Sequence, residues 1–132
     1  MKSTKPQPII DYKISREITV VTDFIGLHKW EDCPYEEVSF LRSPHRHRFY
    51  VRATLPVNHN ERDREFFMVQ KDLIRYTALL ANPLSIPEGT GMSCESMAST
   101  LCKWFMREYE LPWVKVSVSE DDENSATIKY EI

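Results

Sequence analysis

Three histidines are the residues of this chain whose types and spacing could hold a metal ion. His45 and His47 stand two residues apart at the start of a segment with alternating apolar residues, and His28 ends an earlier segment of this kind. Residues at i and i+2 point to one face of a strand, so a histidine from a neighbouring strand could complete a set of three imidazoles. A catalytic zinc ion uses such a set and keeps one position open. The alternative is that they are strand-end histidines with only hydrogen bonds at the rim of a core.

The segment 29–44, between the first histidine and the pair, contains candidate proton-transfer groups. It has two prolines, four acidic residues and no regular period, which predicts a long loop of the kind that is often functional. A Cys33 thiolate beside a cation would have a depressed pKa and could transfer protons. Glu36 and Glu37 could act as general bases. The alternatives are an ordinary loop cysteine and solvated surface charges.

The elements that must position these residues follow from the periodicity of the apolar residues. Strict alternation predicts strands over 12–28, 45–57, 113–120 and 126–132, and helical spacing predicts helices over 65–81 and 94–110, the second with Ser93 as its N-cap. The apolar residues expected to be buried on the two helices are Phe66, Val69, Leu73, Tyr76 and Leu80, and Met97, Leu101, Trp104, Phe105 and Tyr109. The order strand, strand, helix, helix, strand, strand predicts an α+β fold with a four-stranded antiparallel sheet.

Composition excludes several classes of protein. A chain of 132 residues forms one domain, which we expect over 12–132 after a loose tail at 1–11. A net charge of −3 gives no reason to expect nucleic acid or an anionic membrane as partner, and no apolar run is long enough to span a bilayer. Cys33, Cys94 and Cys102 form no Cys-x-x-Cys pair, which favours reduced thiols and a cytoplasmic location. Cys94 and Cys102 are interpreted as small helix-packing residues.

Five short motifs, in order and spacing, resemble the 6-pyruvoyl-tetrahydropterin synthase and 6-carboxy-tetrahydropterin synthase family, which has the tunnelling fold. They are Phe24-x-x-x-His28, His45-Arg46-His47, Phe67-Met68-Val69 followed by Asp72-Leu73, Ser93-Cys94-Glu95-Ser96-Met97-Ala98, and Val116-x-Val118-x-Glu120. The resemblance implies a ββααββ chain that assembles through its sheets into a β-barrel of trimers or hexamers. It also implies one zinc ion held by His28, His45 and His47, and a substrate such as dihydroneopterin triphosphate or a relative.

The resemblance further implies roles for three residues that could contact the substrate. Glu120 would anchor the pterin ring, since a carboxylate can accept paired N–H groups from a 2-amino-4-oxo pyrimidine edge. Glu95 would contact the substrate, although an acid is also favoured at a helix start by the helix dipole. Arg46 stands where the family has glycine, and it would reach a substrate phosphate. The alternatives are that it coats the inner wall of the barrel or pairs with acidic neighbours.

Two departures from the family pattern leave the chemistry open. The family's catalytic cysteine precedes the histidine pair, where this chain has Ser39 and Leu41, and its Asp-His pair has no counterpart in 82–92. The first hypothesis is a zinc-dependent lyase in which Cys33 or Glu37 transfers protons. The second is a binding module or oligomeric scaffold of the same fold without turnover. A third is an enzyme with another GTP-derived substrate, such as a deazaguanine precursor.

Overall fold

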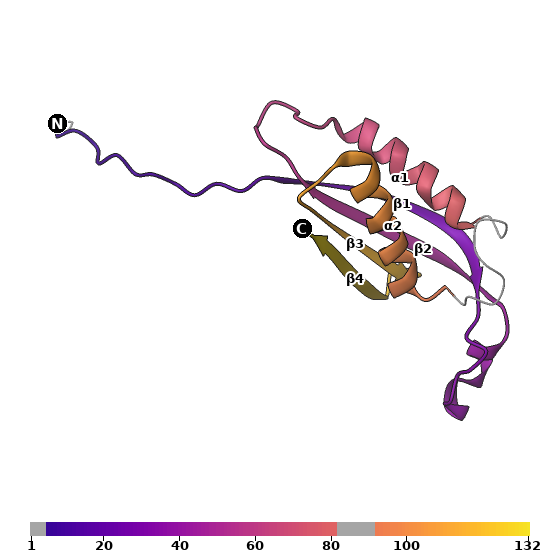
Figure 1. Cartoon of the computed structure of the whole chain (residues 1–132). Helices are drawn as coiled ribbons and strands as arrows, with labels where there is room; N and C mark the ends of the chain where they lie inside the picture. The colour runs from indigo at the N-terminus through magenta and orange to yellow at the C-terminus, as the bar shows by residue number, and fades with distance from the viewer. Residues whose placement is uncertain (1–4, 82–91) are drawn as a thin grey trace.

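The structure, a computed structural model, describes residues 5–81 and 92–132 (Figure 1). Its elements are, in chain order, β1 (Glu17–His28), the 3-10 helix η1 (Glu36–Arg42), β2 (His45–Pro56), α1 (Phe66–Ala81), α2 (Cys94–Tyr109), β3 (Trp113–Glu120) and β4 (Asn124–Glu131). The expected α+β class, with a four-stranded antiparallel sheet and accompanying helices, is confirmed. No helix among the described residues is long and apolar enough to cross a membrane.

The sheet has the strand order β1-β2-β3-β4, and every neighbouring pair is antiparallel. His28 at the end of β1 is paired with His45 at the start of β2, and Phe49 of β2 is paired with Glu120 at the end of β3. Antiparallel pairing therefore gathers the end of β1, the start of β2 and the end of β3 at one end of the sheet. The three histidines and Glu120 lie at this end.

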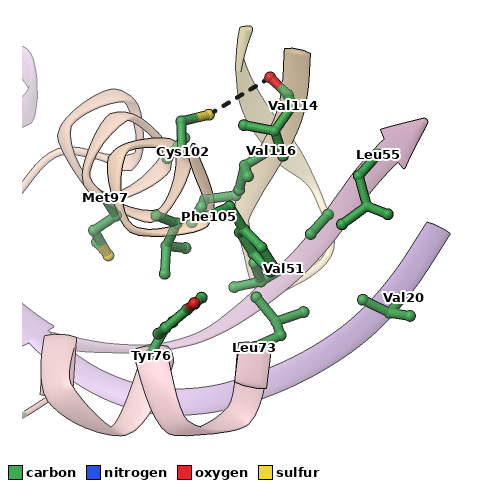
Figure 2. Packing of buried hydrophobic residues seen from close by; sticks show 14 of the residues in the cluster. Val20, Val51, Leu55, Leu73, Tyr76, Met97, Cys102, Phe105, Val114 and Val116 are labelled. Carbon is green, nitrogen blue, oxygen red and sulfur yellow. Dashed lines mark hydrogen bonds between the residues drawn. The ribbon is translucent and has the colours of Figure 1, made fainter. Parts of the chain in front are cut away.

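Both long helices pack on the same face of the sheet, and the core lies between the two layers (Figures 1 and 2). Helix α1 contacts β1, whereas α2 contacts β3 and β4. Alternate residues of β2 and β3 point into this core and are fully buried: Phe49, Val51, Ala53, Leu55, Val114, Val116 and Val118. The opposite face of the sheet is covered by no described element. The helices thus cover one face of the sheet that carries the histidines at its end.

The helix stripes are buried largely as the periodicity predicts. Val69, Leu73, Tyr76 and Leu80 of α1 and Met97, Leu101 and Phe105 of α2 are all at most 5% exposed. Trp104 and Tyr109 are only partly buried against this core. Phe66 is a correction, since its side chain is 59% exposed. It is the first residue of α1, where the helix enters from the polar turn and has no sheet beneath it.

Two further expectations are corrected by the structure. Strand β1 begins at Glu17 rather than at residue 12. Glu17 is paired with Pro56, where the partner strand β2 ends, so the residues before Glu17 have no strand to pair with. The segment 29–44 is not entirely loop, since it contains η1. A hydrogen bond from the Trp30 N–H to the Leu41 carbonyl oxygen (2.6 Å) joins the two ends of this segment. The expected loop 82–92 lies, except for Met92, outside the described residues.

Candidate metal centre and adjoining cavity

The three histidine side chains gather at the end of the sheet that antiparallel pairing creates. The ring centroids of His28 and His45 lie 4.3 Å apart, and those of His47 lie 5.3 and 5.1 Å from them. One ring nitrogen from each residue lies within 4.8 Å of the other two. Phe49 lies beneath the group, since its ring centroid is 5.2 Å from that of His28 and 5.9 Å from that of His47.

Each of the three imidazoles uses its Nδ1 atom in a hydrogen bond to a protein oxygen. The acceptors are the carbonyl oxygen of Met92 for His28 (2.9 Å), the carbonyl oxygen of Ser43 for His45 (2.9 Å), and Oδ2 of Asp121 for His47 (2.6 Å). A carbonyl or carboxylate oxygen can only accept, so Nδ1 carries the proton in each ring. The lone pair is then on Nε2, which is the usual way in which outer partners orient metal-binding histidines.

All three Nε2 atoms are buried from solvent and have no hydrogen-bond partner. A buried polar atom without a partner costs free energy, and three at one point require an explanation. Burial also lowers the pKa of His28, with the neighbouring His45 and His47 acting in the same direction against the hydrogen bond to Met92 and the nearby Glu120. Burial thus favours a neutral ring at His28, the form that binds metals. The donor set of three imidazole nitrogens fits a zinc ion.

Glu120 lies directly against this group of nitrogens. Its Oε1 atom is 3.3 Å from Nε2 of His28, and its Oε2 atom is 3.7 Å from Nε2 of His47. Neither approach has the geometry of a hydrogen bond, because both Nε2 atoms remain without a hydrogen-bond partner. The Glu120 side chain is 35% exposed, so its carboxylate also faces the space in front of the histidines.

A cavity of about 510 Å³ opens onto the histidines. It is lined by His28, Lys29, Trp30, Glu31, Asp32, Leu41, His45, Ser93, Cys94, Glu95, Glu120, Asn124, Ser125 and Ala126. This volume lies within the range of pockets that bury small molecules. Four of the lining residues are acidic, and the ammonium group of Lys29 pairs with the carboxylate of Glu31 at 2.5 Å. The cavity is therefore lined by four carboxylate residues and by the imidazoles of His28 and His45.

Helix α2 contributes a thiol to this cavity. Cys94 packs against the core, as expected of a helix-packing residue, and it also lines the cavity, with Sγ 3.9 Å from Oε1 of Glu120. Burial, followed by the charges of Glu120 and Glu95, raises the pKa of Cys94 to about 12, so the group is a thiol at neutral pH. The N-cap prediction for Ser93 is confirmed, since its Oγ accepts from the N–H of Ser96 at 3.0 Å. Cys102 is buried in the core as expected (Figure 2).

Glu95 and Glu120 both line the cavity, whereas three other predicted site residues do not. Cys33 is 3% exposed, and its thiol lies near the carbonyl oxygens of Tyr35 and Val38. Glu37 is exposed on η1. Arg46 is exposed on the sheet face opposite to His45 and His47, because neighbouring residues of a strand point to opposite sides. These three residues are close to the histidines along the chain, and the structure separates their side chains from the cavity.

Asp121 is a second residue of this site, after Cys94, that the sequence patterns did not predict. It was part of an acidic run that resembles an ordinary solvated turn, and half of its side chain is indeed exposed (48%). The available signal was its place directly after the strand that ends in Glu120. Once β3 is paired with β2, the next residue must lie beside the histidine pair.

Comparisons with known proteins bear on the fold. No family model and no curated protein sequence matches this chain. Among solved structures, 6-pyruvoyl tetrahydropterin synthase of Plasmodium vivax matches with a TM-score of 0.65 and 13% identity, over 91% of this chain and all of that one. An uncharacterized protein of Wolinella succinogenes matches with a TM-score of 0.61 and 13% identity, over 90% of this chain and all of that one.

Two variants of the Plasmodium vivax synthase also match, at TM-scores of 0.63 and 0.61 and 13% identity, over 91% of this chain and all of theirs. In these variants a glutamate named as a catalytic residue is replaced by alanine or cysteine. The chain therefore has the tunnelling fold. More particularly, it has the fold of the 6-pyruvoyl tetrahydropterin synthases, as the order of the sequence motifs predicted.

Proposed function

We propose that this protein is a zinc-dependent lyase of the pterin synthase type, which acts on a GTP-derived reduced pterin such as dihydroneopterin triphosphate or a relative. The observation that carries the proposal is the set of three buried, unpartnered Nε2 atoms at one end of a ligand-sized cavity. The fold supports it, since solved structures with this fold include 6-pyruvoyl tetrahydropterin synthases. Residues 12–132 would form the single catalytic domain.

Zinc bound by the three imidazoles would supply Lewis-acid polarisation of a hydroxyl or carbonyl group on the substrate side chain. The chain's own groups then have separate tasks. The partners of the three Nδ1 atoms keep the rings oriented. Glu120 and Glu95 offer carboxylates that can accept the paired N–H groups of the pyrimidine edge of the pterin. The cavity walls would reduce the access of water to the side chain of the bound pterin.

Cleavage or elimination also requires a group that accepts and returns a proton. We assign this role first to Glu37, because a synthase of this fold uses a catalytic glutamate, although η1 must move to bring the exposed Glu37 carboxylate to the cavity. Cys33 is the second candidate, but its thiol must leave the carbonyl oxygens of Tyr35 and Val38 to act. Glu37→Gln and Cys33→Ser separate these assignments. The first should abolish turnover with zinc retained, and the second should leave most of the activity.

We further propose that the protein assembles as a homo-oligomer, a trimer or hexamer, whose sheets form a β-barrel. The sheet has free edges at β1 and β4, and the face away from the helices combines half-exposed Val21 and Ile25 and exposed Leu27 with charged residues such as Arg46 and Arg52. Such edges and faces are protected by closure into a barrel. Light scattering on the purified protein should give the mass of at least three chains.

The test of the enzymatic proposal combines metal analysis with product analysis. The purified protein should contain about one zinc ion per chain, and chelation should remove its activity on dihydroneopterin triphosphate or on the corresponding dihydropterin without phosphate. Chromatography of the reaction mixture would detect a shortened or eliminated side chain. A correctly folded, metal-free protein with unchanged turnover would eliminate the mechanism.

The second candidate function is a pterin-binding module or oligomeric scaffold without turnover. It is favoured by Ser39 and Leu41 at the places of the family's cysteine and by the inward-turned thiol of Cys33. Saturable pterin binding without product would support it. The third hypothesis, another GTP-derived substrate such as a deazaguanine precursor, uses the same site and would appear as product formation from that substrate only.

A further inference from the structure

We propose that Glu120 is a fourth ligand of the metal ion while the cavity is empty of substrate, and that substrate displaces it. The inference rests on the proposed zinc site and adds to it. The role expected for Glu120 was that of an anchor for the pterin ring. The structure points to a second role for the same carboxylate, before substrate binds.

The first argument is the spacing of the polar atoms. Zinc binds nitrogen and oxygen at about 2.0–2.1 Å, so two ligand atoms of a tetrahedral site lie about 3.3–3.4 Å apart. Oε1 of Glu120 is 3.3 Å from Nε2 of His28, which is the length of one tetrahedron edge, and Oε2 is 3.7 Å from Nε2 of His47. The carboxylate therefore lies about one ligand spacing from two of the three imidazoles, and more than 4.0 Å from the nitrogens of His45, so a small shift toward the ion would complete the set.

Second, the contact between Glu120 and the two imidazoles is not a hydrogen bond. In a charge-assisted hydrogen bond the N–H of the imidazole points at the carboxylate oxygen, and the distance is about 2.7–2.9 Å. Here the closest approach is 3.3 Å, and Nε2 of His28 and of His47 both lack any hydrogen bond. The protons are on the Nδ1 atoms, which donate to other oxygens. Two acceptors that face one another without a proton between them are expected around a shared cation.

The third argument is that neighbouring groups hold Glu120 in this place. It is the last residue of β3, paired across the sheet with Phe49, on whose ring His28 and His47 both pack. On its other side Cys94, at the first turn of α2, has Sγ 3.9 Å from Oε1 and can donate a weak S–H hydrogen bond to it. The carboxylate is thus confined between the helix and the histidines.

The consequence is that the metal ion has four protein ligands while the cavity holds no substrate, and gains an open coordination position when substrate binds. A zinc ion with four protein ligands has the closed arrangement of a structural site, whereas catalysis requires an open position. A pterin in the cavity offers N–H groups to Glu120 and oxygen atoms to the metal. The exchange frees a coordination position and engages the ring in one step. The metal would then be protected from other ligands between turnovers.

The experiment measures the metal directly. Wild type, Glu120→Gln and Glu95→Gln are compared by zinc affinity, in competition with a chelator, and by the visible spectrum of the cobalt-substituted proteins. Glu120→Gln should weaken zinc binding at least about tenfold, the lower end of the effect of removing even an outer partner of a ligand, and should change the cobalt spectrum. Glu95→Gln, a carboxylate of the same cavity, should leave both unchanged. Dihydroneopterin added to the cobalt wild type should change its spectrum.

The outcomes distinguish a failure of this inference from a failure of the proposed function. Unchanged zinc affinity and cobalt spectrum in Glu120→Gln, with weaker dihydroneopterin binding, would overturn the inference and leave Glu120 as a ring anchor only. A wild type that binds no zinc would overturn the proposed function and this inference together. Circular dichroism of the metal-free variants controls for folding. Glu120→Asp, which keeps a shorter carboxylate, should recover part of the affinity if the group is a ligand.

Discussion

Nδ1 of His47 donates a hydrogen bond to Oδ2 of Asp121 at 2.6 Å, although 73 residues separate the two along the chain. The other carboxylate oxygen, Oδ1, accepts from the backbone N–H of Arg48 at 3.1 Å. The hydrogen bond from His47, and then the one from Arg48, hold the pKa of Asp121 below its usual range. One ionised carboxylate therefore fixes both the ring of a candidate metal ligand and the strand that carries it.

Asp121→Ala should weaken zinc binding about tenfold to a hundredfold, which is the usual effect of removing an outer partner of a metal-binding histidine. The physical reason is that the His47 ring loses the carboxylate that accepts its Nδ1 hydrogen bond and keeps the ring oriented. Zinc affinity is measured by competition with a chelator.

Asp122→Ala is the matched control for this change. Asp122 is the next residue and is also exposed, and its backbone is in the left-handed region like that of Asp121 (φ 59° and 53°). Backbone strain from an alanine is therefore similar in both variants. Equal zinc affinities in the two variants would contradict the role given to Asp121.

His45→Ala should remove stoichiometric zinc and any turnover that depends on it. The variant loses one of the three imidazoles that would hold the ion, so the proposed ligand set is incomplete. The bound metal is measured by elemental analysis after gel filtration. His59→Ala is the control, because His59 lies in the turn after β2, where its Nε2 pairs with Asp63 at 3.3 Å. Zinc retained in His45→Ala and lost in His59→Ala would contradict the assignment.

The stability of the helix layer should depend on acid pH through Glu108. Hydrogen bonds from Arg75 and then Tyr76 lower the pKa of Glu108, which joins α2 to α1. Its carboxylate stays ionised in the folded chain at pH values where the unfolded chain already binds a proton. The stabilisation is thus complete above the unfolded pKa of about 4.3 and is lost as pH falls through the folded value.

Urea unfolding of wild type and Glu108→Gln between pH 7 and pH 3 tests this dependence. The free energy of unfolding of wild type should exceed that of the variant at pH 7, and the difference should shrink below pH 4.3 or so. Glu110→Gln, at the C-cap of the same helix, should show no comparable change. A difference that stays constant across this pH range would contradict the prediction.

Cys94 should react slowly with alkylating reagents in the metal-free folded protein. Burial and the nearby acids raise its pKa to about 12, and only the thiolate reacts. At pH 8 its alkylation by iodoacetamide should be at least about a hundredfold slower than in the unfolded chain. Mass spectrometry of the digested protein distinguishes it from Cys33 and Cys102. Glu95→Gln removes one of the nearby charges and should accelerate the reaction, and equal rates in folded and unfolded protein would contradict the prediction.

Patterns within a few residues of one another predicted most of the fold. The period of two in β2 and β3 and the three-to-four spacing in α1 and α2 are set by which side chains face the core, so their burial follows from the sequence. Strand β1 was extended too far, because its start depends on where its partner β2 ends. The helix η1 was missed, because a short 3-10 turn has no apolar period.

The candidate site was also predicted in part from the sequence. The spacing of His45 and His47 predicted that both point to one face and that His28 of a neighbouring strand could join them, and the motif resemblance added a role for Glu120. What sequence could not give is which other groups share that space. Cys33 and Arg46 are near the histidines in the chain, yet their side chains point elsewhere.

The sequence by itself determined the elements of this protein and the types of ligand that they carry, because side-chain periodicity and chemistry are local. Only the tertiary structure decided that Asp121, Cys94 and the Glu120 carboxylate lie beside the histidines. Those contacts depend on the register of β2 against β3 and on the packing of α2 over the sheet. Register and packing are set by the whole core at once, so no segment encodes them alone.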